Sequence, residues 1–407
     1  MSPSTPSTPG LQSGAQSGPT NPSEAWLAKL ALGPDVLLHK VDLVRGAVLA
    51  VGWSEAGYRS ASFLDDRILG PHVKGAWLSG GAVAGALAGP TAGAAGALSA
   101  RRPLHFIFHA GHVGSTLLSR LLDEVPGLPS GPPSGHPMGP ASGQSSGQAS
   151  GEPASPSVAS AVLGLREPLP LRTLAEAHDV LGRADSLLSS AQFEALLQML
   201  AASWQRGYAH TQAVVLKATS STTRVGPALL AALPAARAVC LNLAPEPYLA
   251  TLLAGENAAL DLRGHGPERM RRLQARTTSI TTPLHALSLG EQAALAWLAE
   301  AWSQRELAQQ AGPRILAVDF DELLDNVEGM LAAVLQHFGL DAAAAPLLAR
   351  SPVLTRYSKA TEHAYSPGLR QQVLAQARRD HAVELQRGLR WLETVAAADA
   401  NFAALMR

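Results

Sequence analysis

The chain has 407 residues, enough for two domains or for one large domain with attachments. Its 32 basic residues balance 32 acidic ones, so no overall charge favours nucleic acid or an anionic membrane as a partner. A hydrophobic fraction of 46% supplies a core, and a composition rich in Ala, Gly and Pro with few lysines is typical of a GC-rich bacterial genome. The single cysteine, Cys240, excludes an intrachain disulfide and a cysteine-based metal site, and we expect a buried, inert thiol.

The N-terminal stretch lacks the features of a secretory signal. Residues 1–23 are mostly Ser, Pro, Thr and Gly, which cannot bury enough surface to offset the entropy of ordering, so we predict a disordered tail. The first residues contain neither the basic segment nor the apolar segment of a secretory signal, so we expect a cytoplasmic protein. The Ala- and Gly-rich stretch 75–100 is interrupted by Pro90, which argues against a membrane span.

Residues 24–100 are predicted to form a small N-terminal α/β region. The apolar run 47–51 is typical of a strand, although five apolar residues in a row also fit a piece of helix. A helical stretch follows from Ser54 to Phe63. The region is small and rich in glycine, so an independent domain does not follow from its sequence.

Residues 101–407 show a rhythm of strands and helices. Strands are expected at 104–108, 213–216, 236–241 and 315–318, and helices at 115–124, 191–204, 225–233, 245–253, 291–307 and 323–338. Gly339 is placed to cap the last of these helices, and Ser366-Pro367 begins a long helix that ends near Trp391. This alternation predicts an α/β fold with a parallel sheet and helices on both faces.

A low-complexity tract interrupts this region at about residues 127–160. It consists largely of Ser, Pro and Gly, and a loop of such length without its own structure is uncommon inside a compact domain. We therefore expect a disordered surface insertion.

The segment 104–122 is the most informative part of the chain. An apolar strand leads into the turn Gly111–Gly114, and a helix begins near Ser115. The two glycines let successive N–H groups face one point, and the helix N-terminus adds its free amides and its dipole. The pattern predicts an anion-binding pocket, although a glycine turn without a ligand would look similar.

This loop is not a Walker A motif, which requires a lysine before the Ser or Thr. Here Gly114 precedes Ser115, and no lysine lies nearby. The sequence therefore disfavours an ordinary ATPase or GTPase.

At this point the chain resembles the sulfotransferases, which have a strand, then Pro-[Lys/Arg]-Ser-Gly-Thr-Thr, then a helix. The segments that resemble the family in chain order are Gly111–Leu117, Val215–Thr219, Leu233–Leu241 and Leu316–Leu340. The C-terminal segment Arg356–Lys359 and the long helix after it look like an uncharacterised bacterial branch. The resemblance covers about residues 104–340, apart from the insertion.

The resemblance implies a sulfotransferase-like parallel-sheet core and a co-substrate, phosphoadenosine phosphosulfate, with no metal. The acceptor would be a hydroxyl group of a small molecule or carbohydrate. Gly111, Gly114, Ser115 and Thr116 would hold the phosphosulfate of the donor. Thr251 stands where the family has a serine that binds the 3′-phosphate.

Two positions depart from the family. Its basic loop residue, which helps the transfer, is His112 here, and a histidine carries charge only conditionally because its ordinary pKa is about 6.5. Its 3′-phosphate arginine is matched by Leu243, which cannot supply the bidentate cation that a phosphate favours.

Two further residues are candidates for catalysis. Glu167 resembles a glutamate that serves some sulfotransferases as general base, although an exposed turn residue paired with Arg166 is an equal alternative. Lys217 closes a predicted strand, at the end where open α/β sheets bind ligands. With His112 it would stabilise charge on the transferred group, and the alternative is an exposed lysine without a role.

Two clusters carry weaker indications. His105, His109 and His112 have no carboxylate or cysteine beside them, so we predict no metal site. Four arginines follow a predicted turn at 264–267 and form either a solvated face or a basic lid over an anionic nucleotide: Arg269, Arg271, Arg272 and Arg276.

Two other functions stay open at this stage. One is a kinase-like, nucleotide-dependent phosphoryl transferase on the same scaffold, favoured by Leu243 but opposed by the missing Walker lysine and the lack of a clear Mg²⁺-binding acidic motif. The other is a non-catalytic protein that binds a nucleotide or partner through the loop.

Overall fold

The computed structural model describes residues 21–88, 101–127, 159–255, 257–358 and 360–406. The predicted disorder of residues 1–20 and 128–158 lies outside them. The predicted tail is too long by three residues, because Asn21 caps helix α1 (Pro22–Leu32) by accepting a hydrogen bond from the Ser23 amide. At the insertion the two described stems are joined, since the Gly127 amide donates to the Ala159 carbonyl at 2.7 Å.

The centre of the molecule is a five-stranded sheet, and all its strands are parallel. Its strands in chain order are β4 (Leu104–His109), β5 (Val162–Arg166), β6 (Ala213–Lys217), β7 (Ala238–Asn242) and β8 (Ile315–Asp319). Their spatial order is β5-β6-β4-β7-β8, so the first strand lies in the middle. The chain leaves β4 toward β5 and leaves β7 toward β8, and this reversal opens a crevice at the carboxyl ends of β4 and β7.

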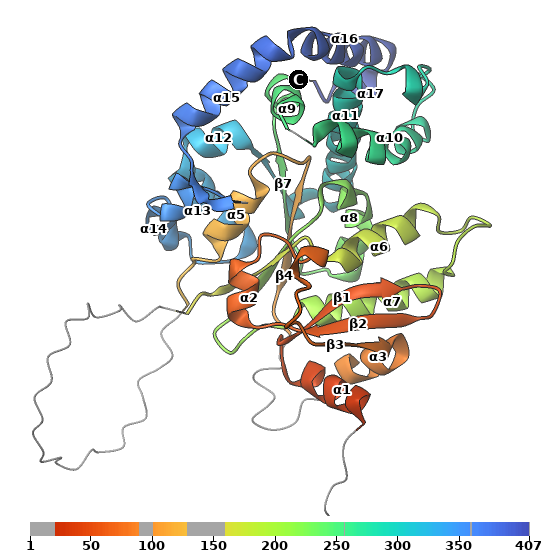
Figure 1. Ribbon diagram of the computed structural model, residues 1–407, viewed down its shortest axis with the longest axis vertical. Coiled ribbons are helices and arrows are strands. Elements are labelled where there is room, and N and C mark those ends of the chain that lie inside the picture. Colours follow the sequence, from red (N-terminus) through yellow and green to blue (C-terminus); the bar gives the residue numbers. More distant parts are fainter. Residues whose placement is uncertain (1–20, 89–100, 128–158, 256, 359, 407) are drawn as a thin grey trace, which may run out of the picture.

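Helices cover both faces of this sheet (Figure 1). The helices between its strands are α5 (Ser115–Leu122), α6 (Leu169–Asp179), α7 (Ser190–Trp204), α8 (Gly226–Ala232), α9 (Pro245–Leu253), α10 (Ala258–Gln274) and α11 (Leu289–Ala311). After β8 follow α12 (Phe320–Asp325), α13 (Val327–Phe338), α14 (Ala345–Leu348), α15 (Pro367–Asp380), α16 (Ala382–Ala398) and α17 (Ala400–Ala403). The predicted α/β fold with a parallel sheet and helices on both faces is confirmed.

Alternating side chains on the strands divide the core into two clusters. On β4, Ile107 packs with α5, α9, α11 and α13, whereas Phe106 and Phe108 pack with α6, α7 and α8. Cys240 is buried in the second cluster, as expected, and burial raises the pKa of its thiol to about 12.

The N-terminal region carries its own antiparallel sheet of three strands: β1 (Val36–Asp42), β2 (Ala47–Gly52) and β3 (Gly75–Ser79). Two further helices, α2 (Glu55–Ser60) and α3 (Gly80–Ala88), belong to it. Its buried side chains, such as Leu38 and Val48, belong to the same cluster as Phe106 of the central sheet. The small sheet is thus packed onto the larger fold, as Figure 1 shows beside α7.

Three predictions differ from the observed structure by more than the bounds of an element. The predicted helix 323–338 is divided at Asn326, which ends α12 and whose side chain caps α13, while Gly339 takes the expected left-handed conformation at φ 71°. The long C-terminal helix is likewise divided at His381 into α15 and α16. The predicted turn 264–267 is wrong, because these residues lie inside α10.

Between α14 and α15 the chain forms a hairpin of β9 (Arg356–Tyr357) and β10 (Ala360–Ala364). The Arg120 side chain of α5 donates to the Ser358 carbonyl of this hairpin at 2.7 Å. The same guanidinium reaches the N-terminal region through the Ser62 hydroxyl at 2.8 Å.

Among the described residues, no helix is long and apolar enough to cross a membrane.

Candidate functional site

The loop between β4 and α5 has an unusual backbone. Gly111, His112 and Gly114 all have positive φ, at 94°, 55° and 72°. At Gly114 a side chain is excluded twice, because a Cβ there would also lie 2.0 Å from a ring atom of Phe320. The chain can therefore turn sharply from β4 into α5 only with glycine at this position.

Helix α5 presents an uncapped N-terminus at the crevice. Gly114 is its N-cap and offers no side chain to the first amides, which have no acceptor within a helix. Ser115 and Thr116 are buried in the first turn, and the Thr116 Oγ1 atom has no hydrogen-bond partner among the described residues. Free amides, a dipole end and an unpartnered hydroxyl make this turn suited to an oxyanion.

Two buried side chains hold the loop from below. The His109 ring accepts a hydrogen bond from the Gly111 amide at Nδ1 and donates from Nε2 to the Ala218 carbonyl, at 3.0 and 2.7 Å. Both nitrogens are thus used in the neutral form of the ring. The Tyr248 hydroxyl donates to the Ala110 carbonyl at 3.0 Å. These contacts fix the loop backbone to β6 and α9.

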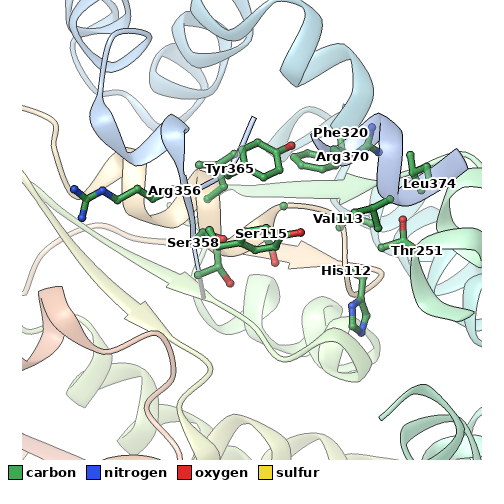
Figure 2. Close-up of a pocket in the computed structure, with 15 residues that line it drawn as sticks. His112, Val113, Ser115, Thr251, Phe320, Arg356, Ser358, Tyr365, Arg370 and Leu374 are labelled. Atoms are coloured by element: carbon green, nitrogen blue, oxygen red, sulfur yellow. The ribbon is translucent and has the colours of Figure 1, made fainter. Parts of the chain in front are cut away.

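A first cavity of about 220 Å³ lies at the N-terminus of α5. The loop side of its wall includes Gly114, Ser115 and Thr116, and Thr251 of α9 joins them. Opposite lie the ring of Phe320, two tyrosines and two arginines: Tyr357, Tyr365, Arg356 and Arg370. Figure 2 shows the Phe320 ring and the Arg370 side chain above the loop, with the imidazole of His112 pointing away from them.

A second cavity, also of about 220 Å³, lies on the other side of the loop. Gly111 and Glu167 line it, together with Phe63, Arg67, His109, Ala110, Ser220, Tyr248, Leu252, Asp261 and Arg269. His112 lines both cavities. The loop between β4 and α5 therefore lines two cavities, and His112 is the residue that their walls share.

Glu167 and Lys217 are brought together by neighbouring strand ends. β5 and β6 pair in parallel with Arg166 opposite Lys217, so Glu167 follows directly, and its amide donates to the Lys217 carbonyl at 2.7 Å. The Lys217 ammonium forms an ion pair with Glu167 Oε1. This leaves Oε2 as the carboxylate oxygen that can accept a proton.

Two of the three predicted catalytic residues, His112 and Glu167, have a strained backbone. They are the two non-glycine residues with positive φ in the described part of the chain, at 55° and 53°. Such a conformation is costly for a residue with a side chain and persists where the surroundings impose it. Both lie at the second cavity, so the strain is concentrated where chemistry was predicted.

Neither Lys217 nor Glu167 has the surroundings that its alternative interpretation requires, which were an exposed lysine and a local pair with Arg166. Lys217 is not an exposed strand-end lysine, since its side chain is 0% exposed. Glu167 does not pair locally with Arg166, whose guanidinium instead forms a buried ion pair with Asp123 and donates to the Tyr58 carbonyl. Burial, with nearby arginines, lowers the pKa of Arg166 to about 9.

Lys217 differs in position from the other predicted site residues. Within the part of the chain that the structure describes, it does not belong to the wall of either cavity. It reaches the site through its ion pair with Glu167.

Two arginines line the first cavity, although the position that matches the family's 3′-phosphate arginine is Leu243. Leu243 is buried, and its carbonyl accepts from Trp297 Nε1 at 2.9 Å, so it contributes no charge. The first cavity instead has Arg356, which is exposed, and Arg370, whose Nη2 lies 2.7 Å from Asp321 Oδ1. Both come from the C-terminal segment, where the sequence showed the family likeness but assigned no role.

The basic cluster of α10 is divided, because Arg271 and Arg276 lie on the exposed side of the helix and the other two arginines do not. Arg269 and Arg272 are buried, because the helix continues through Pro267 and turns both into the protein. Arg272 pairs with Glu300 at 2.7 Å, and Arg276 pairs with Glu306 at 2.6 Å.

The histidines near the loop have separate surroundings. His105 stacks on Phe338 with the ring centroids 4.9 Å apart, while His109 supports the loop and His112 lines the cavities. Among the described residues, no three His, Cys, Asp or Glu side chains gather where they could hold a metal ion.

Comparison with solved structures finds sulfotransferases, the family whose motifs the sequence resembles. The sulfotransferase domain of the curacin biosynthetic pathway is 13% identical, with 72% of this chain and 99% of that domain covered and a TM-score of 0.35. The sulfotransferase domain of the Synechococcus olefin synthase is 16% identical, with 73% and 96% covered and a TM-score of 0.33. A sulfotransferase from Mycobacterium avium is 13% identical, with 70% and 78% covered and a TM-score of 0.33.

Likenesses at this level carry no conclusion about activity. Neither a family model nor a curated protein matches the chain. The function must therefore be inferred from the motifs and from the geometry of the two cavities.

Proposed function

We propose that this chain transfers a sulfuryl group from phosphoadenosine phosphosulfate to a hydroxyl group of a small-molecule or carbohydrate acceptor. The observation that carries the proposal is the pair of cavities that meet at His112. One has the features of an oxyanion and nucleotide site, and the other contains a carboxylate. A transferase needs this arrangement, because donor and acceptor must approach one point from two sides.

The residues of the first cavity fit the donor. Gly114, Ser115 and Thr116 offer amides and hydroxyls to the phosphosulfate, and the buried, unpartnered Thr116 Oγ1 lacks an acceptor that such a group would provide. The rings of Phe320 and Tyr365 supply faces against which a purine can stack. The bound donor supplies the activated sulfuryl group.

We assign the 3′-phosphate to Arg356, while Thr251, which Figure 2 shows at the other end of the first cavity, would contact another part of the donor. The guanidinium of Arg356 forms no ion pair with other described residues, and the side chain is exposed and long enough to reorient. In Figure 2 it points away from Ser115, so binding requires it to turn inward. Arg370 is already engaged by Asp321 and stacks on Phe320 at 5.2 Å, which suits it to shaping the wall.

On the acceptor side, Glu167 acts as general base. The acceptor oxygen forms a bond to sulfur, its proton passes to Glu167 Oε2, and the bond from sulfur to the phosphate oxygen breaks to release phosphoadenosine phosphate. Lys217 is a positioning residue that holds Oε1, in place of the direct role expected from the sequence. His112, at the junction of the cavities, donates to the oxygens of the transferred group.

Ligand preference distinguishes the proposed transferase from a kinase-like enzyme and from a protein that binds a partner other than a nucleotide. A kinase-like enzyme would be stabilised by ATP. A protein that binds another partner would be stabilised neither by ATP nor by phosphoadenosine phosphate. We expect phosphoadenosine phosphate, the product nucleotide, to raise the melting temperature more than ATP does, since a ligand of the folded state stabilises by mass action. Equal shifts, or a larger shift with ATP, would refute the proposed donor.

The cytoplasmic location stays a prediction of the sequence.

A matched pair of variants makes this test specific. Thr116→Val removes the unpartnered hydroxyl in the first cavity and should reduce the shift with phosphoadenosine phosphate. Thr223→Val is the control, because Thr223 Oγ1 is also buried without a partner among the described residues but lies outside the walls of both cavities. A reduced shift in both variants would indicate a general loss of stability and would contradict the assignment of Thr116.

A further inference from the structure

The second cavity contains a charged side chain that the proposed transfer does not use. Arg269 of α10 lines this cavity beside Asp261, Tyr248 and Leu252, and the residue is only 3% exposed. Lysine and arginine are almost never buried to this degree unless they are paired. Its partners therefore decide what the cavity can bind.

The hydrogen bonding of Arg269 is incomplete. Its Nε and Nη1 atoms have no hydrogen-bond partner among the described residues, and its Nη2 lies 3.7 Å from Asp261 Oδ2, beyond hydrogen-bond length. The Asp261 side chain is 46% exposed and lies equally far, 3.7 Å, from His265 Nε2. Its carboxylate is thus shared and largely solvated, so it compensates the buried guanidinium only in part.

The other buried arginine of α10, Arg272, has the partners that Arg269 lacks. Arg272 is also buried, and it has Glu300 at 2.7 Å, Glu268 at 3.0 Å and a hydrogen bond to Ser303. The fold therefore pairs one buried arginine of α10 with carboxylates of its own and leaves the other, at the cavity, without equivalent partners. A guanidinium presents several N–H donors in a fixed plane that matches a carboxylate or phosphate.

The rest of the wall limits the size and character of the ligand. Phe63, Tyr248 and Leu252 contribute apolar surface within a cavity of about 220 Å³. Arg67 stacks on the Phe63 ring at 3.5 Å and forms an ion pair with Asp65, which compensates its charge. The charge of Glu167 is compensated by Lys217. Arg269 is the cation of this wall whose charge is least compensated among the described residues.

We infer that the acceptor is a hydroxylated anion: a small molecule that carries a carboxylate or phosphate, bound by Arg269, besides the hydroxyl that faces Glu167 and His112. This inference rests on the proposed function, because it takes the second cavity as the acceptor site. It narrows the acceptor class from hydroxyl compounds in general to those with an oxyanion. Arg269 then orients the acceptor, and the transfer chemistry stays with the loop and Glu167.

The test uses the full chain saturated with phosphoadenosine phosphate, which occupies the first cavity and prevents the probes from binding at the loop. Calorimetric titration then compares para-hydroxybenzoate with para-hydroxybenzamide, and glycerol phosphate with glycerol. In each pair only one member is an anion, and the two members of the first pair also have nearly the same shape. We expect the anion of at least one pair to bind at least about tenfold more tightly, which is the scale of hydrogen bonds to a charged group.

Variants assign this preference to the arginine. Arg269→Gln should remove the preference, and Arg269→Lys should retain part of it because the charge remains. The control is Arg271→Gln, which makes the same charge change on the same helix, where Arg271 is exposed and outside the cavity wall. If Arg269→Gln does not fold, the lysine variant and the wild-type comparison still decide.

The outcomes keep the two proposals apart. Binding of phosphoadenosine phosphate without any anion preference, or a preference that Arg269→Gln leaves unchanged, overturns the anionic acceptor while the donor assignment stands. No binding by any probe overturns it as well. Failure of phosphoadenosine phosphate to bind at all refutes the proposed function itself.

Discussion

At the scale of single residues, the buried ion pair between Lys217 and Glu167 is expected to matter for folding as well as for catalysis. Lys217→Met leaves the Glu167 carboxylate without its partner, and breaking a buried pair from one side costs roughly 3–5 kcal/mol. The double variant Lys217→Met/Glu167→Leu should recover much of this loss, since no unpaired charge remains. Urea unfolding of the single and double variants measures both effects.

An exposed lysine would behave differently. Its substitution would change the free energy of unfolding by less than about 0.5 kcal/mol, and the double variant would show no recovery. That result would contradict the burial of Lys217 described above.

The backbone of His112 gives a second prediction. With φ at 55°, a residue with a Cβ is strained, so His112→Gly should be more stable than His112→Ala by about 1 kcal/mol. At Gln198, an exposed position inside helix α7, the order should reverse, because glycine is disfavoured within helices. Chemical unfolding of the four variants gives the comparison, and a more stable alanine at both positions would exclude strain in the loop.

The sequence predicts a site at the loop residues, but it does not predict the contacts between residues that are distant along the chain. Gly111 to Thr116 were assigned because their chemistry is local, as it depends on glycine conformation and on the start of a helix. The meeting of Glu167 with Lys217 depends on which strands are neighbours, and the spacing along the chain does not contain this order. Arg269 was misjudged for the same reason, since its burial is decided by elements far away in the sequence.

At the scale of elements, strand β4 and helix α13 meet at a buried histidine. The His105 ring stacks on Phe338, and burial, together with the charges of Arg237 and His337, lowers its pKa to about 4. In the unfolded chain the ordinary value is about 6.5, so between these values the unfolded state binds more protons. Stability should therefore fall as the pH decreases from about 6.5 toward 4.

The variant His105→Phe keeps the stacking and removes the titration. We expect it to reduce the loss of unfolding free energy between pH 7 and pH 5 by about 2 kcal/mol. His285→Phe, at an exposed histidine, is the control and should leave the loss unchanged. Unfolding curves at the two pH values provide the measurement, and equal losses in wild type and His105→Phe would contradict a depressed pKa.

Elements were predicted well where their pattern is local and strong. Helix α9 has the predicted bounds, and α7 and β4 differ by one residue. Helix α10 was missed because Gly264, Gly266 and Pro267 are typical of a turn, whereas Leu262, Met270 and Leu273 bury one side of the helix and keep it continuous. Tertiary packing thus overrode local preference.

At the scale of the whole molecule, the segments around the two cavities come from distant parts of the chain. The loop after β4, the segment between β5 and α6, helix α10 and the C-terminal hairpin all contribute to their walls. Arg120 links the loop helix to both the hairpin and the N-terminal region through hydrogen bonds. The division of the chain into an N-terminal region and a sulfotransferase-like region stays a prediction, but the buried side chains of the two share one cluster.

The donor nucleotide is the central claim, and its 3′-phosphate distinguishes it from other adenine nucleotides. Calorimetric titration with phosphoadenosine phosphate and with adenosine monophosphate compares ligands that differ only in that group. We expect the first to bind at least about tenfold more tightly, and Arg356→Gln to reduce the difference, because a phosphate paired with a guanidinium gains charge-assisted hydrogen bonds. Arg350→Gln, at an exposed arginine outside the cavity wall, should leave it unchanged. Equal affinity of the wild-type protein for the two nucleotides would contradict the account.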